Sequence, residues 1–304
     1  MHRYHKLSPQ EHQILIEKGT ERPRVGEYTE FSEAGVYVCR QCDAPLYLSS
    51  QKFTSACGWP SFDDEIKGAI QRHLDSDGER IEILCQRCNA HLGHVFTGEQ
   101  LTKNNTRHCV NSISMRFIAA FTSEGYERAL VAGGCFWGVE HLLKSLPGII
   151  KTTVGYTGGT VVNPTYEEVC TGKTGHAEAI EVVFDPEMVS YENVIKLFFE
   201  IHDPTQYQQQ GPDRGSQYRS AIFYADDAQR EVAEAYIRQI DAAGIFEDKV
   251  QTTLEPLTEF FPAEAYHHGY AARNPEQPYI RAVAAPKVRK LREVHGDRLK
   301  GAAT

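Results

Sequence analysis

The sequence predicts a two-domain protein in which a mainly antiparallel β domain precedes an α+β sandwich. The chain has 304 residues, about twice the length of a typical domain. Short strand-like runs dominate its first part, whereas strand and helix patterns alternate in its second part. A Ser/Glu/Gly stretch over 121–129 separates two apolar runs. We therefore expect one domain over 1–122 and another over 126–304.

The sequence of the first domain predicts one early helix over about 8–18, followed by short strands. Runs of β-branched and aromatic residues are bounded by turn residues, which is typical of strands. The runs are GVYVC, APLYLS, RIEILC, HLGHVF and SISMRFIAA. These strands are short and joined by turns, so we expect most of them to pair antiparallel.

Two C-x₂-C pairs in the first domain indicate a metal site. They are CRQC at 39–42 and CQRC at 85–88. A single pair of this kind could be a redox dithiol, but two pairs in one small domain favour zinc. Four thiolates complete a closed tetrahedral site, which stabilises a fold and leaves no open position for catalysis. The expected ligands of this structural zinc are Cys39, Cys42, Cys85 and Cys88.

The second domain alternates strand-like and helix-like patterns. Ser190 is placed to cap one helix and Gly244 to end another. In chain order the expected elements are strand 128–132, a helix from Cys135, strand 177–186, helix 190–203, strand 218–225, helix 226–244, strand 249–257, a short helix near 264–274 and a helix that Pro286 begins in the basic tail. Helices packed on a sheet in this order predict an α+β sandwich, for which we expect the ferredoxin-like form.

Composition narrows the classes of partner. The net charge of −9 argues against nucleic acid or an anionic membrane as the main partner. No apolar run approaches about 18 residues, and the polar start MHRYHKLSPQ lacks the apolar stretch of a signal peptide. Eight cysteines in a long chain of this kind indicate metal or redox chemistry rather than a disulfide framework. We therefore expect a cytoplasmic protein.

Cys135 stands between a predicted strand and a predicted helix, in the stretch VAGGCFWGVE. Gly133 and Gly134 allow a tight turn between the two elements. Cys135 is then expected in the first helical turn, where free N–H groups and the helix dipole favour a thiolate. The alternative is a small apolar residue of the core.

Cys109, in TRHCVNSISMRF, is a second candidate thiol. On a strand, Arg107, Cys109 and Asn111 would point to one face, so that a cation and an amide flank the thiol. Nearby positive charge lowers a thiol pKa. The alternative is a strand cysteine beside a surface arginine. Two further motifs, HLGHVF and CGWPSF, add the candidate residues His91, His94, Cys57 and Trp59.

These motifs resemble those of a known pair of enzymes. Residues 5–120 resemble the B-type methionine sulfoxide reductases through CRQC, CGWPSF, CQRC, HLGHVF and RHCVNSISMRF. Residues 127–290 resemble the A-type enzymes through GGCFWGVE, GYTGGT, NPTYEEVC, TGHAEAIEV and GPDRGSQYRSAIF. The resemblance implies a bifunctional oxidoreductase that repairs oxidative damage. It would reduce methionine sulfoxide, free or in proteins, with the R epimer at the B-like domain and the S epimer at the A-like domain.

For the A-like domain, the resemblance makes Cys135 the nucleophile and Glu178 the acid that protonates the sulfoxide oxygen. Burial against aromatic groups would raise the pKa of Glu178, whereas the alternative is a solvated carboxylate at a strand edge. Phe136 and Trp137 would enclose the substrate methyl. The remaining polar positions of this site are Tyr166, Tyr218 and Asp213.

For the B-like domain, the resemblance makes Cys109 the nucleophile, and no carboxylate takes the acid role. The candidates for the acid are His91 and His94, while Arg107 and Asn111 fix the polar end of the site and Trp59 covers the methyl. Attack produces a sulfenic acid, which Cys57 would condense to a disulfide. Thioredoxin or a similar dithiol would then restore the enzyme, with no organic cofactor.

Regeneration of Cys135 has three open routes. Cys170 could attack the sulfenic acid, a thiol of the B-like domain could reach across, or an external thiol could act directly. Ile280 occupies a place where relatives often carry cysteine, and Cys170 could instead be a buried structural residue. We favour the external thiol.

Two other classes of protein share part of this pattern. A thiol peroxidase would also form sulfenic acids, but it would prefer peroxide to methionine sulfoxide as oxidant. A zinc-dependent binding module would account for the first domain without catalysis, and it would tolerate Cys109→Ser.

Overall fold

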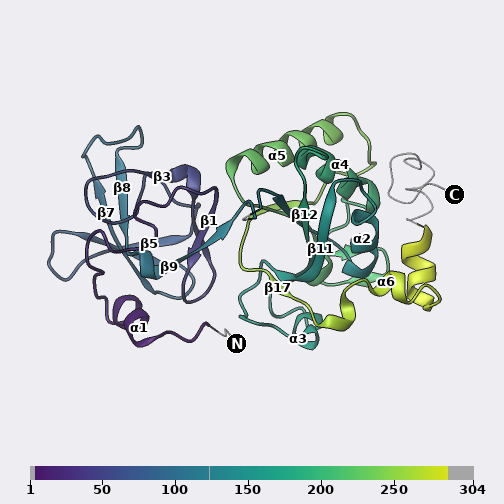
Figure 1. Ribbon diagram of the computed structural model, residues 1–304, viewed down its shortest axis with the longest axis horizontal. Helices are drawn as coiled ribbons and strands as arrows, with labels where there is room; N and C mark the ends of the chain where they lie inside the picture. The colour runs from purple at the N-terminus through teal and green to yellow at the C-terminus, as the bar shows by residue number, and fades with distance from the viewer. Residues whose placement is uncertain (1–3, 123, 287–304) are drawn as a thin grey trace. The chain divides into compact units, whose positions relative to one another are not determined.

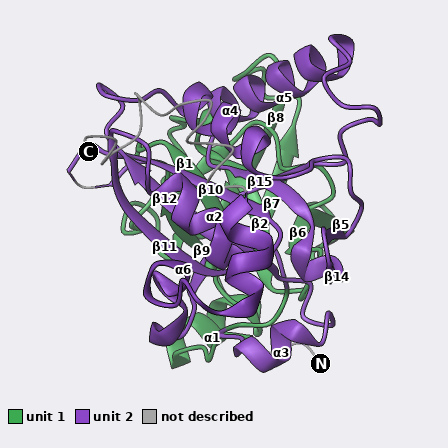
Figure 2. Cartoon of the chain, turned by 90° about the vertical axis from the view of Figure 1, so that its right-hand side faces the viewer, with its two compact units in different colours: residues 1–120, 160–162 green, residues 121–159, 163–304 purple. Residues whose placement is uncertain are grey.

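The computed structural model describes residues 4–122 and 124–286. Its chain forms two compact units (Figure 2). Unit 1 comprises the residues up to 120 together with 160–162, and unit 2 comprises 121–159 and the residues from 163 onward. Each unit has its own hydrophobic core.

Unit 1 contains two sheets and one short helix (Figure 1). Helix α1 (Pro9–Leu15) begins at Ser8, which forms a capping box with Glu11. One sheet has the strand order β2 (Pro45–Leu48), β1 (Gly35–Cys39), β9 (Met115–Ala119). The other has the order β3 (Lys52–Phe53), β4 (Ser61–Phe62), β8 (Thr106–Val110), β7 (His91–Thr97), β6 (Ile81–Cys85), β5 (Ile70–Leu74). All of these pairings are antiparallel, which confirms the predicted class.

The core of unit 1 fixes the strands that carry its functional residues. Tyr47 on β2 and Phe62 on β4 have no exposed surface, and their rings stack with centroids 4.1 Å apart. Tyr37 on β1 meets Phe62 edge-on at 5.0 Å. Because β4 pairs with β8, this packing holds β8 from one side.

Unit 2 is built on a six-stranded sheet with helices against it. The strand order is β16 (Thr253–Pro256), β15 (Ser220–Tyr224), β10 (Glu127–Gly133), β12 (Ala177–Phe184), β11 (Ile149–Thr157), β17 (Phe261–Pro262). The pairing of β15 with β16 is parallel and the others are antiparallel. The helices are α2 (Phe136–Leu143), α3 (Tyr166–Cys170), α4 (Tyr191–Ile201), α5 (Asp227–Ala242) and α6 (Tyr270–Arg273). A two-stranded ribbon joins β13 (Gln209–Gln210) to β14 (Asp213–Arg214).

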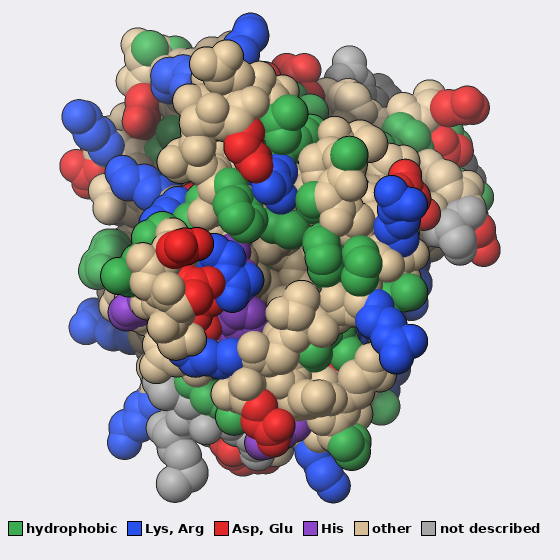
Figure 3. Space-filling view, turned by 90° about the vertical axis from the view of Figure 1, so that its left-hand side faces the viewer, with side chains coloured by type: hydrophobic (Ala, Val, Ile, Leu, Met, Phe, Trp, Pro, Cys, Tyr) green, Lys and Arg blue, Asp and Glu red, His purple; other side chains and the backbone are tan. Residues whose placement is uncertain are grey.

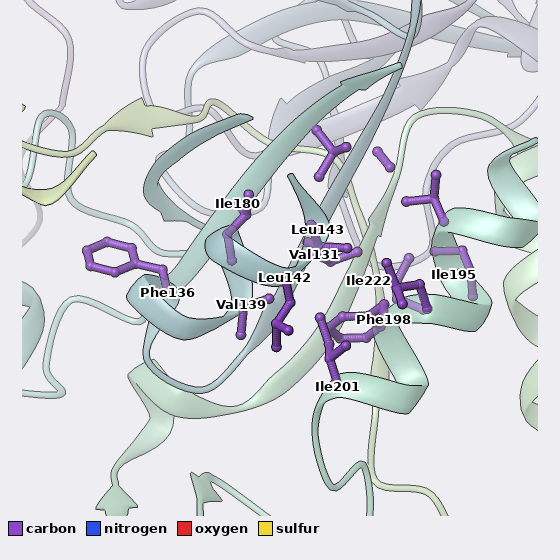
Figure 4. Packing of buried hydrophobic residues seen from close by; sticks show 14 of the residues in the cluster. Val131, Phe136, Val139, Leu142, Leu143, Ile180, Ile195, Phe198, Ile201 and Ile222 are labelled. Atoms are coloured by element: carbon purple, nitrogen blue, oxygen red, sulfur yellow. The ribbon is translucent and has the colours of Figure 1, made fainter. Parts of the chain in front are cut away.

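The core of unit 2 lies between the sheet and helices α2 and α4 (Figure 4). Val139 and Leu142 of α2 and Phe198 of α4 are nearly or fully buried there. They face Val131 of β10 and Ile180 of β12, which have no exposed surface. This packing fixes the axis of α2, and therefore the position of the cysteine that precedes it.

Most predicted elements of unit 2 are present. Ser190 caps α4 through the Asn193 N–H, and Gly244 follows the end of α5 with φ +59°. One expectation is wrong: Pro286 does not begin a helix, because helical turns already run from Pro278 and include a π-helical stretch over Ile280–Ala284. The rest of the basic tail lies outside the described residues. Among the residues that the structure describes, no helix is both long and apolar enough to cross a membrane.

Candidate active sites and a four-cysteine cluster

Cys109 lies on β8, between β4 and β7, where it faces Ser61 on one side and His94 on the other in the strand register. Its Sγ lies 3.5 Å from the Sγ of Cys57. Cys57 comes from the CGWPSF loop before β4, so the two thiols meet because this loop and β8 are neighbours in one sheet. The structure thus brings together two candidate thiols that are 52 positions apart.

The two thiols share one proton. The hydrogen bond with Cys109 lowers the pKa of Cys57 to about 4, and the hydroxyls of Ser55 and Ser61 assist. The Ser55 hydroxyl donates to the Cys57 sulfur at 3.0 Å. The same hydrogen bond to Cys57, followed by burial, raises the pKa of Cys109. The positive charge of Arg107 acts in the predicted direction on Cys109 but is outweighed.

Gly93 allows β7 to lie against Cys109. Its φ is +153°, and a Cβ there would stand 2.0 Å from the carbonyl oxygen of Cys109. A bulge opposite Ile83 and Leu84 adds one residue to β7 next to this glycine. The bulge cancels the usual alternation, so that His91 and His94 lie close together with ring centroids 5.6 Å apart.

The two histidines have different surroundings. His91 is 2% exposed, and its Nδ1 lies 2.7 Å from Glu82 Oε1. Burial lowers the pKa of His91, which favours the neutral ring, and outweighs the opposite effect of Glu82. His94 lines a pocket, and its Nε2 lies 2.7 Å from Asp75 Oδ2. The pattern HLGHVF predicted both rings, but it gave no sign of these carboxylate partners.

The pocket over Cys109 has a volume of about 110 Å³. Its lining consists of Thr20, Trp59, Arg80, Gly93, His94, Phe96, Cys109 and Asn111. Trp59 is held by its Nε1–H, which donates to the Glu21 carbonyl at 2.9 Å, and Asn111 accepts from the Glu21 N–H at 2.9 Å. The face of the molecule in Figure 3 shows histidine, acidic and basic side chains at the border of a hollow.

Arg107 flanks the Cys109 thiol, because its guanidinium hydrogen-bonds to that thiol and its charge lowers the pKa of Cys109. Its guanidinium forms a two-pronged ion pair with Glu99, at 2.7 and 2.8 Å, and lies 4.4 Å over the Phe96 ring. It does not line the pocket, whereas Arg80 does. Arg80 and Asp75 belong to the turn DSDGER between β5 and β6, and Arg80 Nη2 lies 3.1 Å from the Asp75 carboxylate. Sequence reasoning missed this turn because nothing in its polar residues distinguishes it from a solvated loop.

The four cysteines predicted to bind metal form one cluster. Their sulfur atoms all lie within 4.8 Å of one another, and the pairs Cys39–Cys88 and Cys42–Cys85 are both 3.6 Å apart. Tetrahedral zinc with bonds of about 2.3 Å places sulfur atoms about 3.8 Å apart, so the cluster fits zinc. Among the described residues, it is the one group of three or more potential ligands that could hold an ion.

The two C-x₂-C turns have the same backbone pattern. The Cys39 N–H donates to the Ala44 carbonyl at 2.8 Å, and the Cys85 N–H donates to the Ala90 carbonyl at 2.9 Å. Asp43 and Asn89 both have positive φ, near +60°. Each turn thereby presents two sulfur atoms on one side, as zinc knuckles do.

Cys135 is the N-cap residue of α2, one position before the first turn in which the sequence placed it. Gly134 makes the preceding turn with φ +91°, and a Cβ there would stand 2.5 Å from the side chain of Gln210. Burial, followed by the charge of Glu178, raises the pKa of Cys135. The Trp137 N–H at the helix start lowers this pKa, as predicted, but by a smaller amount. The net shift is upward, which is opposite in direction to the shift that the helix position led us to expect.

Glu178 lies on β12 beside the start of α2. It is 1% exposed, and its Oε2 accepts a hydrogen bond from the Phe136 N–H at 3.1 Å. Burial raises the pKa of Glu178 to about 8, with a further contribution from Asp213. A buried carboxylic acid that keeps its proton at neutral pH is suited to donate that proton.

Three tyrosine hydroxyls surround these two groups. Burial and the charge of Glu178 raise the pKa of Tyr218, and burial also raises that of Tyr166, so both hydroxyls remain donors. Tyr279 donates to Asp213 Oδ2 in a short hydrogen bond and also bonds to the Cys135 sulfur. Sequence reasoning considered Ile280 but missed Tyr279 beside it.

The aromatic residues after Cys135 have different exposures. Phe136 is fully buried, whereas Trp137 is partly exposed and stacks on Tyr270 with centroids 4.0 Å apart. The Trp137 Nε1–H donates to His267 Nδ1 at 3.0 Å. His267 is 1% exposed, and its ring also contacts Tyr166 at 4.6 Å. Sequence reasoning missed His267, which lies in a short helical turn distant from the other motifs.

Cys170 ends α3 and is exposed, so it is not the buried structural residue that one alternative required. Its thiol pairs with the Tyr166 hydroxyl. Within the described residues, Cys135 has hydrogen-bond partners in Tyr279 and the start of α2, whereas Cys109 has a second thiol.

Both halves of the chain match known protein families. Residues 127–299 match the peptide methionine sulfoxide reductase family, and residues 7–119 match the SelR domain. The MsrA protein of Natronomonas pharaonis is 47% identical over 171 residues, which are 56% of this chain and 96% of that protein. The MsrA protein of Thermus thermophilus is 51% identical over 167 residues, which are 55% of this chain and 94% of that protein. The reduced form of Mxr1 from Saccharomyces cerevisiae, a solved structure, is 35% identical, covers 51% of this chain and 90% of its own, and has a TM-score of 0.48.

The fold and the two thiol sites define a cysteine-dependent oxidoreductase. The chain belongs to the peptide methionine sulfoxide reductase family, with a B-type SelR domain fused before the A-type domain. It is an enzyme that reduces methionine sulfoxide, and it carries one domain for each sulfoxide epimer.

Proposed function

We propose that Cys135 reduces the S epimer and Cys109 the R epimer, in domains that span 126–304 and 1–122. The observation that carries the proposal is the placement of a buried, protonated Glu178 at the start of the helix that Cys135 caps. A sulfoxide oxygen needs a proton as its bond to sulfur breaks, and this carboxyl group supplies one at neutral pH.

At the A-type site, the Cys135 sulfur attacks the sulfoxide sulfur while Glu178 protonates the oxygen. The S–O bond of the substrate breaks, the oxygen passes to Cys135 as a sulfenic acid, and methionine leaves. The thiol proton of Cys135 replaces the proton that Glu178 gave away, so protons and electrons balance. Tyr166 and Tyr218 donate hydrogen bonds to the oxygen, Asp213 holds Tyr279 in place, and Phe136 and Trp137 enclose the methyl.

At the B-type site, His94 takes the place of the carboxyl acid, and Asp75 orients it. Asp75 contacts His94 Nε2, and His94 lines the pocket, so Nδ1 is the ring nitrogen that remains to act as the acid. His91, which is neutral and paired with Glu82, supports the wall behind His94. Asn111 and Arg107 fix the polar end, and Trp59 covers the methyl. The sulfenic acid on Cys109 then condenses with the Cys57 thiol, which lies 3.5 Å away, and releases water.

The two sites differ in how the oxidised cysteine is reduced back to a thiol. The Cys57–Cys109 disulfide is a substrate for thioredoxin or a similar dithiol. The sulfenic acid on Cys135 is reduced by an external thiol directly, with attack by the exposed Cys170 as the second route. Because both cycles need a supply of reduced thiols, we place the enzyme in the cytoplasm, with methionine sulfoxide, free or in oxidised proteins, as its substrate.

We propose that Cys39, Cys42, Cys85 and Cys88 bind zinc. The spacing of their sulfur atoms and the paired turns support this ligand set. The ion supplies stability, since a closed site of four thiolates has no position for substrate.

We also propose a ferredoxin-like fold for the second domain. Its elements β10, α2, β11, β12, α4 and β15 follow a βαββαβ order, and the strands lie in the sheet as β15-β10-β12-β11. This arrangement places the end of β10, and hence Cys135, at one end of β12, which carries Glu178.

Turnover of each purified epimer tests the assignment of the sites. Cys135→Ser is expected to abolish reduction of the S epimer and to spare the R epimer, while Cys109→Ser does the reverse. The activity that each variant retains shows that the chain is folded. Loss of both activities from one replacement, in a folded protein, would contradict the assignment of two separate sites.

A further inference from the structure

The Cys57–Cys109 pair has the geometry of a chelating dithiol. The two sulfur atoms lie 3.5 Å apart, which is close to the 3.6 Å between paired sulfur atoms in the four-cysteine cluster. A single thiophilic atom can therefore bond to both sulfur atoms without moving the backbone. One thiol is half-buried in the CGWPSF loop, and the other lines the pocket.

The pair does not resemble a site for a free metal ion. Among the described residues, a set of three or more potential ligands gathers only at Cys39, Cys42, Cys85 and Cys88. Zinc and similar ions need three or four ligands. A dithiol with no third protein ligand suits a centre that has three bonds and brings the third substituent itself. Trivalent arsenic with one organic group is such a centre.

The pocket has room for a small substituent. It holds about 110 Å³ and is lined by Trp59 and Phe96 beside Cys109. A methyl group fits this space and packs well on aromatic rings. The site that we assign to the sulfoxide methyl is therefore also placed to receive a methyl group on arsenic.

We propose that Cys57 and Cys109 bind a monosubstituted trivalent arsenical, such as methylarsonous acid, as a chelate. Two As–S bonds form and two As–OH bonds break. The hydroxyls leave as two water molecules, one with the proton that the two cysteines share and one with a proton from solvent. Arsenic stays trivalent and the sulfurs are not oxidised, so no further reactant is needed. Binding requires only reduced thiols, whereas the resulting inhibition rests on the proposed role of Cys109 as nucleophile.

The A-type site serves as a comparison within the same chain, because its candidate thiol is not paired with a second thiol among the described residues. The partners of Cys135 are the start of α2, Glu178 and Tyr279, and the thiol of Cys170 bonds to Tyr166 instead. A single thiol forms one As–S bond and gains no chelate effect, which is typically worth at least about 100-fold in affinity. Methylarsonous acid is therefore expected to inhibit R-sulfoxide turnover at concentrations that leave S-sulfoxide turnover unchanged.

The test titrates the reduced, zinc-loaded full chain with methylarsonous acid and follows both turnovers, the zinc content and the mass of the intact protein. The expected result is one CH₃As unit per chain, mapped to Cys57 and Cys109, with zinc retained and R turnover lost. A small dithiol should reverse the effect. Cys57→Ser and Cys109→Ser should each weaken binding by at least about 100-fold, and the matched control Cys170→Ser should leave it unchanged.

Three outcomes would overturn the inference: equal inhibition of both epimers, arsenic bound only with loss of zinc, or unchanged affinity in Cys57→Ser. A chelate mapped to Cys57 and Cys109 with R turnover intact would support the arsenical site and refute the proposed role of Cys109. The two failures are therefore distinguishable.

Discussion

The two sites that we propose place a cysteine in opposite surroundings. Cys109 lies within a sheet, 3.5 Å from a second thiol, with a histidine as the nearest candidate acid. Cys135 caps a helix beside a buried carboxyl group, and tyrosine hydroxyls surround it. In the B-type site the surroundings favour fast capture of the oxidised cysteine. In the A-type site they favour delivery of a proton.

In both sites the surroundings raise the pKa of the cysteine that we propose as nucleophile. The pKa of Cys109 is raised first by its hydrogen bond to Cys57, and that of Cys135 first by burial. In each site a neighbouring group can accept the proton: the Cys57 thiolate in one, and Glu178 after it has protonated the substrate in the other. The proton partner, rather than the position of the cysteine on a strand or helix, sets the reactivity.

The largest difference is expected when the metal ligands are changed, since only the B-type domain contains them. Cys39→Ser should reduce zinc from one ion per chain to near zero and abolish R-sulfoxide turnover. It should lower the unfolding temperature of unit 1 by more than about 10 °C, while S-sulfoxide turnover continues. Elemental analysis and differential scanning calorimetry measure this, with Cys170→Ser as the control. A folded, zinc-free protein that still reduces the R epimer would contradict the structural role of the ion.

The next effect concerns the carboxyl group that only the A-type site has. Glu178→Gln should lower kcat for the S epimer by about 100-fold or more, because an amide cannot deliver the proton, and should leave the R epimer unaffected. Glu181→Gln on the same strand is the matched control, since Glu181 pairs with Arg128 and does not contact Cys135. Steady-state kinetics with both epimers measures these changes in kcat. An unchanged kcat of Glu178→Gln for the S epimer would contradict the role of Glu178 as the acid.

The pH dependence checks the same residue without a mutation. Glu178 acts in its protonated form, so S-sulfoxide turnover should hold steady below its pKa of about 8 and decline above it, by about tenfold per pH unit. Glu178→Gln should remove this decline. Persistence of the same alkaline limb in the variant would assign the proton to another group.

A smaller effect is expected at the turn that carries Asp75. Asp75→Asn should lower kcat for the R epimer by about tenfold with little change in KM, because the ring of His94 loses its charged partner while the pocket wall remains. Asp75→Glu should recover part of the rate. Asp77→Asn is the control, because Asp77 belongs to the same turn and bonds to Arg80 rather than to His94. A rise in KM with kcat unchanged would show that Asp75 shapes the pocket and does not act through His94.

Local sequence pattern predicted the elements whose buried faces are continuous. β1 and β12 are almost wholly buried and were found, as was α4 with its Ser190 cap. β5 was missed because four of its five residues face outward or lie at the surface, so no apolar alternation remains. β11 was missed because the exposed residues Ile150 and Lys151 separate buried Ile149 from the continuous buried run that starts at Thr153 and Val154.

The residues of the candidate sites also fall into two groups, those that local sequence predicts and those that it does not. Thiols, histidines and metal ligands stand in short motifs, so the sequence names them without a fold. Asp75, Glu21 and Tyr279 act across the tertiary structure, and no local pattern connects Tyr279 with Asp213, 66 positions away. Helix position alone predicted a thiolate at Cys135, but the sequence could not show the burial that outweighs it.

One measurement tests the contrast between the two sites most directly. The fully reduced chain is given one equivalent of either purified epimer, with no reductant, and the oxidised cysteines are mapped by mass spectrometry with a sulfenic acid trap. Our account predicts a Cys57–Cys109 disulfide after the R epimer and a trapped sulfenic acid on Cys135 after the S epimer. A stoichiometric Cys135–Cys170 disulfide, or the same oxidised cysteine after both epimers, would contradict it.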